Sequence, residues 1–546
     1  MDQQRYADLL KCLYGTEVLP QVLNRLLELI ARYRGKISKP DNDHLTERDA
    51  ILITYGDQVR YPGLPHLRIL GEFCDRYLKG VVSGIHLLPF FPWSSDDGFS
   101  IIDYRKVDPA LGDWTDVKNL AAGFRLMVDG VVNHVSSQSE WFQAFLRNEP
   151  PYRDFFITVD GNPDLSTVIR PRTLPLLTEF QTTTGARRVW TTFSADQVDL
   201  NFQNPDVLLE IFDILFQYIQ NGAQFIRLDA IAYLWKEIGT TCLHLPQTHV
   251  FIQLFRAVLD EIAPHVRIIT ETNVPHKENI TYFGDGSNEA QLVYNFALPP
   301  LVLHTLLNGD STALTRWAAG LYLPSGQTTF FNFLASHDGI GLNPARGILS
   351  DAEIEKLIQV TFAHGGRVSY KNNPDGTQSP YEMNINYFDA LNSPSESDPP
   401  AMKIDRFMAA QAIMLAMKGV PGIYFHSLFG SRGWNEGVIK SGQNRSINRE
   451  KLEYQQLEND LNQPGSRRVQ IFSRFRDLLL LRAASPAFHP FGKQEVIDRG
   501  SAIFAVWRIS PDGQQKTLCL QNITACEQPV DAYLLAPYQT LWINSM

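Results

Sequence analysis

The chain has 546 residues, of which 44% are hydrophobic and 20% are charged, a composition typical of a folded globular protein. Its 49 basic and 59 acidic residues give a net charge of −10, which disfavours nucleic acid as the main partner. The length predicts either several domains or one large α/β barrel with additions.

The cysteines and the N-terminal sequence bear on the cellular compartment. The five cysteines are scattered and include no Cys-x-x-Cys pair, so we expect reduced thiols and neither a disulfide framework nor a zinc site. The first residues lack the basic and apolar regions of a signal peptide, and no run approaches the roughly 20 apolar residues of a membrane span. We therefore expect a cytoplasmic protein with no membrane partner.

The N-terminal part of the chain is predicted to be helical. Apolar residues recur at helical spacing within residues 9–13 and again within residues 23–30, after Pro20. A polar linker follows at residues 36–48. We interpret residues 1–48 as a helical extension, which serves either as a packing arm or as a lid.

From residue 49 onward, strand-like and helix-like segments alternate. Eight such units predict a closed parallel (β/α)8 TIM barrel, formed by residues 49–134 and 201–490. The expected strands are residues 50–55, 84–90, 125–132, 223–228, 266–270, 291–296, 328–335 and 422–425.

Three other segments depart from this alternation. Residues 135–200, between the third and fourth strands, are rich in aromatic residues and prolines and predict a small inserted domain. Residues 367–400 have the composition of a long loop, which in a compact protein is usually functional or disordered. Short alternating strands predict a C-terminal β-domain at residues 491–546.

Three acidic residues, Asp229, Glu271 and Asp338, follow strand-like apolar runs. In a parallel barrel such positions meet at the C-terminal rim, where active sites lie. Retaining cleavage of a glycosidic bond needs two carboxyl groups roughly 5–5.5 Å apart, and neighbouring strands are about 4.7–4.9 Å apart. Because Asp is the shorter acid and Glu reaches further, Asp229 suits attack on the sugar carbon, and Glu271 suits proton transfer to an oxygen beside the ring. Each acid taken alone is also compatible with a helix cap or a surface residue.

Other polar residues near the strand ends extend this pattern. Arg227 points to the same side of its strand as Asp229 and is expected to keep that carboxylate ionised, although an Arg-x-Asp pair is often purely structural. Asp338 could brace the sugar hydroxyls as positive charge develops on the ring. His337 and His134 would donate further hydrogen bonds to those hydroxyls.

Further short motifs accompany these strand ends. They occupy residues 53–57, 86–91, 96–99, 169–172, 189–193, 236–242, 295–301, 336–341, 419–424 and 445–449. Together with the acidic strand ends, they resemble the signature regions of the α-amylase clan, glycoside hydrolase family 13, and within it the sucrose phosphorylase subfamily. The resemblance extends from about residue 50 to residue 450, most of the chain.

The resemblance implies roles for individual residues. Asp229 would be the nucleophile, Glu271 the general acid and base, and Asp338 the transition-state stabiliser. No cofactor and no metal site are implied. The implied glucose subsite consists of Asp96, Phe99, His134, Phe193, Arg227, His337 and Arg445.

The acceptor side departs from the subfamily pattern. Arg170 and Arg172 lie where relatives bring an arginine to phosphate, although a solvated loop pair is the alternative. Asn273 stands where sucrose phosphorylases typically have a histidine, which puts fructose in doubt as the leaving group. His276 and Lys277 lie nearby in sequence. Residues 367–385 are expected to border this side, because family members have a mobile loop there.

The N-terminal extension and the motifs at residues 93–99 and 271–277 look most like the branch of the subfamily that acts on glucosylglycerate. That branch reversibly converts 2-O-α-glucosylglycerate and phosphate into α-glucose 1-phosphate and glycerate. The expected partners are therefore a small glucoside and inorganic phosphate. The sequence leaves the oligomeric state open, between a monomer and a homodimer.

Three alternative functions remain. The first is phosphorolysis of sucrose, sucrose 6-phosphate or glucosylglycerol, and the second is an α-glucosidase or transglucosidase. The third is a non-catalytic partner of a membrane transporter, which is disfavoured because all three acids are present.

Overall fold

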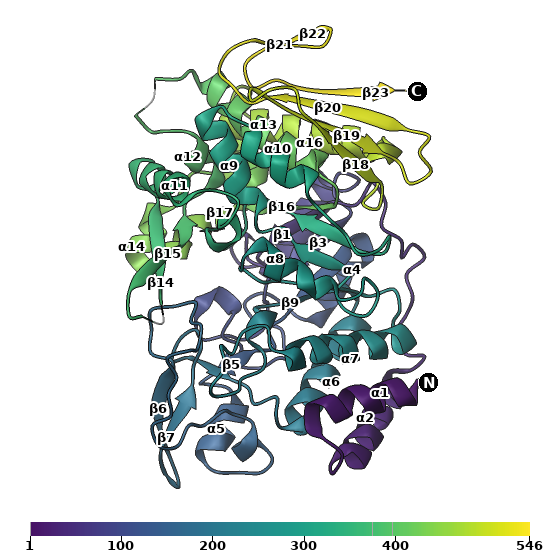
Figure 1. Cartoon of the computed structure of the whole chain (residues 1–546), viewed down its shortest axis with the longest axis vertical. Coiled ribbons are helices and arrows are strands. Elements are labelled where there is room, and N and C mark those ends of the chain that lie inside the picture. Colours follow the sequence, from purple (N-terminus) through teal and green to yellow (C-terminus); the bar gives the residue numbers. More distant parts are fainter. Residues whose placement is uncertain (1, 374, 396, 546) are drawn as a thin grey trace.

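The centre of the molecule is a closed barrel of eight parallel strands, as the sequence predicts for a (β/α)8 fold (Figure 1). The structure is a computed structural model that describes residues 2–373, 375–395 and 397–545. In the order in which they pair around the barrel, the strands are β1 (Ile51–Thr54), β16 (Val420–Tyr424), β12 (Thr329–Asn332), β11 (Leu292–Tyr294), β10 (Arg267–Thr270), β9 (Ala223–Leu228), β4 (Arg125–Gly130) and β3 (Gly84–Leu87).

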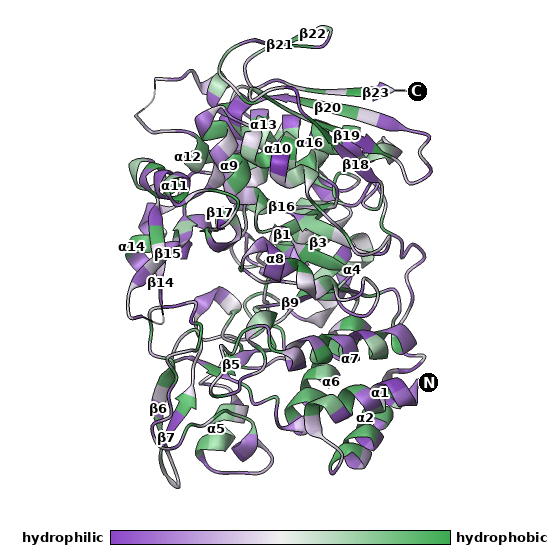
Figure 2. Cartoon of the chain, in the orientation of Figure 1, coloured by the Kyte–Doolittle hydropathy of each residue, from purple (hydrophilic) through white to green (hydrophobic). Residues whose placement is uncertain are grey.

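The barrel strands are short apolar runs that are buried on both faces. Every residue of β1, β3, β11, β12 and β16 is buried, as expected for a parallel sheet covered by helices, and Figure 2 shows the central strands in green. Several strands end earlier than predicted. The run expected at residues 84–90 ends at Leu87, because Pro89 has no amide hydrogen with which to continue the ladder.

Helices and short paired strands surround the barrel, and local signals explain where some of the helices start. Asn204 caps α6 by accepting a hydrogen bond from the amide of Asp206, and Pro205 opens the helix. No described helix is both long and apolar enough to cross a bilayer. The remaining elements around the barrel are α3 (His66–Tyr77), α4 (Trp114–Gly123), α6 (Pro205–Gln220), α7 (Pro246–Ile262), α8 (His276–Asn279), α9 (Leu298–Asn308), α10 (Thr312–Ala319), α11 (Asp351–Ala363), α13 (Pro400–Ala416), α14 (Asn435–Ser441), α15 (Tyr454–Asn462), α16 (Arg467–Ala483), β2 (Val59–Arg60) and β17 (Leu452–Glu453).

The chain between β4 and β9 makes a long excursion, at the lower left of Figure 1. It contains helix α5 (Glu140–Leu146) and a hairpin of β6 (Leu177–Thr182) and β7 (Gly185–Trp190). Near its two ends, β5 (His134–Ser136) pairs antiparallel with β8 (Gln197–Asp199). This pair holds together the two points at which the chain leaves and rejoins the barrel. The domain boundaries at residues 135 and 200 stay a prediction.

The prediction of a loop at residues 367–400 is wrong. This segment forms a hairpin of β14 (Arg367–Asn372) and β15 (Gln378–Asn384), followed by α12 (Tyr387–Leu391), and β15 also pairs with β13 (Ile340–Gly341). Pro374 and Glu396 lie outside the described residues. β14 lacks the apolar alternation that indicates a strand, because most of its side chains are exposed or half-buried.

The two ends of the chain pack on different sides of the barrel. Helices α1 (Gln3–Tyr14) and α2 (Leu19–Tyr33) lie against α7 and α6 (Figure 1), and Arg34 forms an ion pair with Glu261. The C-terminal strands form an antiparallel sheet, which Arg508 ties to the end of α13 by donating to the carbonyls of Ala416 and Met417. These strands are β18 (Lys493–Ile497), β19 (Ile503–Ile509), β20 (Lys516–Asn522) and β23 (Thr540–Ser545), beside a small hairpin of β21 (Gln528–Val530) and β22 (Tyr533–Leu535).

The limits of the two terminal domains stay predictions. Met1, with which the predicted helical extension starts, and Met546, with which the predicted β-domain ends, lie outside the described residues.

Candidate functional site

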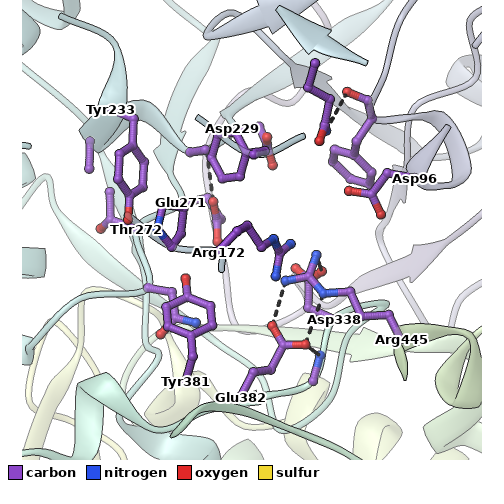
Figure 3. A pocket seen from close by; sticks show the side chains of 18 of the residues that line it. Asp96, Arg172, Asp229, Tyr233, Glu271, Thr272, Asp338, Tyr381, Glu382 and Arg445 are labelled. Carbon is purple, nitrogen blue, oxygen red and sulfur yellow. Dashed lines mark hydrogen bonds and ion pairs between the residues drawn. The ribbon is translucent and has the colours of Figure 1, made fainter. Parts of the chain in front are cut away.

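One cavity lies at the C-terminal ends of the barrel strands (Figure 3). Its wall contains Asp229 after β9, Glu271 after β10 and Asp338 after β12. Arg227 lies next to the cavity in contact with Asp229, whereas Arg170 does not line the wall. The other predicted site residues that line the cavity are Asp96, Phe99, His134, Arg172, Phe193, Asn273, His337 and Arg445.

The register of β9 and β10 brings Asp229 and Glu271 together. Leu228 pairs with Thr270, so the two acids are the next residues on neighbouring strands. The amide of Ala230 donates to Glu271 Oε2 at 2.9 Å. Ala230 adopts a left-handed backbone conformation with φ 47°. Such a conformation is uncommon for a residue with a side chain. Here it directs the amide after the first acid at the second acid.

Arg227 interacts with both Asp229 and Glu271. Its Nη1 donates to Asp229 Oδ1 at 2.7 Å, and its Nη2 lies 3.9 Å from Glu271 Oε2. The same guanidinium pairs with Asp129 of β4, whose other oxygen lies 2.8 Å from His86 Nε2. Asp129 lies within a predicted strand, but it was not among the predicted site residues. The signal was its position opposite Arg227 in the register of β4 and β9.

Burial and charge set the protonation of the two acids. Burial raises the pKa of Asp229, and Arg227 opposes that rise. Burial also raises the pKa of Glu271. Arg227 donates directly to Asp229 and only approaches Glu271, so its charge favours ionisation of Asp229 over ionisation of Glu271. The Ala230 amide acts in the other direction, because it favours the charged form of Glu271.

Asp338 lies among arginines. Arg445 Nη1 lies 2.5 Å from Asp338 Oδ1, and Arg449 Nη2 lies 3.6 Å from the same oxygen. Burial would raise the pKa of Asp338, but Arg445 and its neighbours outweigh that effect and lower the pKa. Asp338 is therefore a carboxylate. Its neighbour His337 stacks on Phe99 with ring centroids 4.8 Å apart, and burial lowers the pKa of His337 to about 3.

Two residues that hold this cluster were missed at the sequence level. Glu382 on β15 accepts from Arg445 Nη2 at 2.6 Å and from the amide of Gly339 at 3.1 Å. Arg449 donates to the carbonyl of His337 at 2.9 Å and pairs with Asp97 at 2.7 Å. Their partners are distant in sequence, so spacing gave no signal.

Arg172 lies in the same cavity wall and, with Arg449 and Arg445, lowers the pKa of Asp96 against the effect of burial. Among the described residues, Arg172 makes no hydrogen bond or ion pair, and it shares the wall with Tyr233 and Tyr381. Asn273 also lines the cavity, and its buried Oδ1 has no partner in the described part of the chain. Gly341 leaves room for it, because a Cβ there would lie 2.5 Å from that oxygen.

The other two basic residues near Asn273 in sequence lie away from the cavity. His276 packs against Trp317 and Phe330, and Lys277 is exposed. Neither belongs to the cavity wall.

A buried lysine cross-links the wall beside His134. Lys236 Nζ lies 2.5 Å from Asn133 Oδ1 and 2.5 Å from Asp199 Oδ2. The side chains of Lys236 and Asp199 are 3% and 0% exposed. This cation was not foreseen from the sequence. Across the described residues, no three His, Cys, Asp or Glu side chains are arranged to hold a metal ion.

The barrel and its acids define an enzyme of the α-amylase type, and residues 76–318 match the profile of the alpha amylase catalytic domain. The chain shares its fold with the crystal structure of sucrose 6F-phosphate phosphorylase from Thermoanaerobacter thermosaccharolyticum. The TM-score is 0.77 at 24% identity, with 92% of this chain and 100% of the other covered.

Curated relatives show which enzymes of the α-amylase type this chain resembles most strongly in sequence. The chain is 52% identical to glucosylglycerate phosphorylase of Spirochaeta thermophila, over 96% of this chain and 90% of that protein. It is 44% identical to the Escherichia coli protein of the same name, over 99% of this chain and 100% of the other. The chain therefore belongs to glycoside hydrolase family 13, among the phosphorylases of its sucrose phosphorylase subfamily.

The contacts of Lys236 predict a large loss of stability when its charge is removed. In Lys236→Met, Asp199 remains buried without its cation, so the free energy of unfolding should fall by about 3–5 kcal/mol, measured by urea denaturation. The control Lys277→Met removes an exposed ammonium and should change it by less than about 0.5 kcal/mol. Equal effects of the two variants would contradict the cross-link.

Proposed function

We propose that the protein is a retaining phosphorylase that reversibly converts 2-O-α-glucosylglycerate and phosphate into α-glucose 1-phosphate and glycerate. Relatives at 44–52% identity, aligned over nearly the whole chain, carry the name glucosylglycerate phosphorylase, and this observation carries the choice of acceptor. The cavity with its three acids supports the chemistry.

In the first half of the proposed reaction, the glucose unit is transferred from glycerate to a carboxylate of the protein. An oxygen of Asp229 attacks C1 of the glucose unit while the bond from C1 to the glycerate oxygen breaks. Glu271 gives its proton to that oxygen, and glycerate leaves. The arrangement around Arg227 supports these roles, because it favours the charge on Asp229 and the proton on Glu271.

In the second half, phosphate replaces glycerate. A phosphate oxygen attacks C1, its proton passes to the Glu271 carboxylate, and the bond to Asp229 breaks with the electron pair returning to that carboxylate. Both steps develop positive charge on the sugar ring. Asp338, kept ionised by Arg445, is suited to stabilise that charge and to accept hydrogen bonds from sugar hydroxyls.

The proposed glucose subsite uses the remaining polar wall. Phe193 offers an apolar face to the sugar ring. His337, held against Phe99, is neutral and can donate to a hydroxyl. The other residues proposed for this subsite are Asp96, His134, Arg227 and Arg445.

The acceptor subsite has to receive two different small anions in turn. Arg172 forms no salt bridge with a described carboxylate, so its guanidinium is free to bind the glycerate carboxylate and then phosphate. Asn273, with an unpartnered buried oxygen, is proposed to bind a hydroxyl group of the acceptor. Arg170 lies outside the cavity wall, and we give it no direct contact.

The setting of the enzyme is also part of the proposal. Its substrates would be a small glucoside and phosphate in the cytoplasm, and a homodimer is the proposed assembly. We propose residues 1–48 as an extension, 135–200 as an inserted domain and 491–546 as a terminal domain.

An acceptor panel with α-glucose 1-phosphate tests the function. We expect glycerate to release phosphate fastest, because its carboxylate matches Arg172, while fructose, fructose 6-phosphate and glycerol react slowly. The measurement is phosphate release together with chromatography of the glucosides. If fructose gives a glucoside and glycerate does not, the acceptor is wrong. If glucose is released from glucosylglycerate equally well without phosphate, the protein is a hydrolase.

Removing the proposed nucleophile tests the mechanism. Asp229→Asn should lower the rate of phosphorolysis by roughly 10⁴-fold or more, because no glucosyl-enzyme can form. Mass spectrometry of the wild-type protein quenched with substrate should detect a glucose unit on the peptide that contains Asp229, and the variant should lack it. Retained activity in Asp229→Asn would exclude this residue as nucleophile.

Two neighbouring arginines provide a matched test of the anion subsite. Arg172→Gln should raise the KM for phosphate by about 10–100-fold, since a charge-assisted hydrogen bond contributes about 1.5–3 kcal/mol. Arg170→Gln removes the same group two residues away, outside the cavity, and should leave this KM near the wild-type value. Initial rates at varied phosphate measure both. A larger effect at Arg170 would reverse the assignment.

A further inference from the structure

Three segments that form the proposed glucose subsite meet at one aspartate outside the inner cavity. Residues 94–100 carry Asp96 and Phe99, the strand β5 carries His134, and residues 193–197 carry Phe193. Asp196 lies in the last of these segments. It does not line the cavity that contains the three acids. It lines a second, neighbouring pocket, which shares Asp96 and Phe193 with that cavity.

The Asp196 carboxylate is surrounded by serine hydroxyl groups from the other two segments. Toward residues 94–100, the hydroxyls of Ser94 and Ser100 lie 2.5 and 2.8 Å from Oδ2, and Ser95 also donates to this oxygen. Toward the end of β5, the hydroxyls of Ser137 and Ser136 lie 2.7 and 3.3 Å from Oδ1.

The backbone of Asp196 joins the same segments. Its carbonyl accepts from the amide of Ser137 at 2.9 Å and also lies 2.9 Å from the Ser100 hydroxyl, whose one hydrogen is shared between this carbonyl and Oδ2. Burial raises the pKa of Asp196, but the serine hydrogen bonds outweigh that effect and lower the pKa. The group is therefore a carboxylate, which presents acceptor oxygens to serine hydroxyls of both neighbouring segments.

The loop that this carboxylate holds is strained where it faces the cavity. Asp96 and Asp97 both have left-handed backbones, with φ 52° and φ 48°, and Gly98 follows with φ 108°. A side chain at Gly98 would place its Cβ 2.7 Å from the carbonyl oxygen of Pro89. Residues with side chains keep such conformations only where the surroundings hold them. Asp97 has one restraint in Arg449, and the serines on both sides of the turn provide another.

We propose that Asp196 is a positioning residue for the glucose subsite. Without touching the sugar, it fixes the strained turn that presents Asp96 and aligns that turn with His134 and Phe193. The inference rests on the proposed function, because it concerns the subsite for the transferred glucose.

The test separates the glucose subsite from the phosphate subsite. Asp196→Asn replaces one acceptor oxygen by an NH₂ group, so serine hydroxyls facing it lose their acceptor. The variant is made in an Asp229→Asn background, which keeps α-glucose 1-phosphate intact, and calorimetry measures binding of α-glucose 1-phosphate and of inorganic phosphate. We expect the affinity for α-glucose 1-phosphate to fall about 10–100-fold, because small misplacements of binding groups have effects of that size. The affinity for phosphate should stay unchanged.

Asp285→Asn in the same background is the control. Asp285 also accepts from a serine hydroxyl, Ser287 at 2.8 Å, but it is exposed and does not line the cavity. It should bind both ligands as the parent protein does. If Asp196→Asn is insoluble, the double variant Ser95→Ala/Ser137→Ala removes one donor from each neighbouring segment and should show the same selective loss.

Two outcomes would overturn the inference. The first is unchanged affinity for α-glucose 1-phosphate in the Asp196 variant. The second is an equal loss for both ligands, which would make Asp196 a general structural residue. If the Asp229→Asn parent binds neither ligand, the proposed function itself fails, and the role of Asp196 fails with it.

Discussion

The guanidinium of Arg227 is the interaction on which the site depends. Its side chain is only 2% exposed, and an isolated charge at that depth would be very costly. It is stable there because the carboxylates of Asp129 and Asp229 accept hydrogen bonds from it. In addition, its Cζ lies 5.3 Å from the ring centroid of Tyr294, in a cation–π contact. Since all of these partners come from barrel strands or strand ends, the closed barrel is what fixes the charge.

The arginines in and around the cavity differ in whether they form salt bridges with carboxylates. Arg227, Arg445 and Arg449 each have carboxylate partners, so their charges are compensated within the protein. Arg172 has none among the described residues. Arg172 therefore differs from these three arginines in having no salt bridge within the described residues, and this is why it is the proposed contact for an anion.

The sequence predicted what depends on local pattern. Apolar runs located the eight strands, and the acids that follow them identified Asp229, Glu271 and Asp338 as residues that share one cavity. The hairpin of β14 and β15 was missed because its strands are polar and half-exposed. Glu382, Arg449, Lys236 and Asp196 were missed for another reason: each acts through partners far away in sequence, which only the folded chain brings together.

Lys236 gives the cavity wall a cation that is part of the chain. Calcium and magnesium bind readily to phosphate oxygens. If such an ion held the wall, phosphate, the enzyme's own co-substrate, would compete with the wall for it. An ammonium group attached to the backbone cannot be sequestered. The wall beside His134 therefore keeps its cation even where phosphate, the co-substrate of phosphorolysis, is abundant.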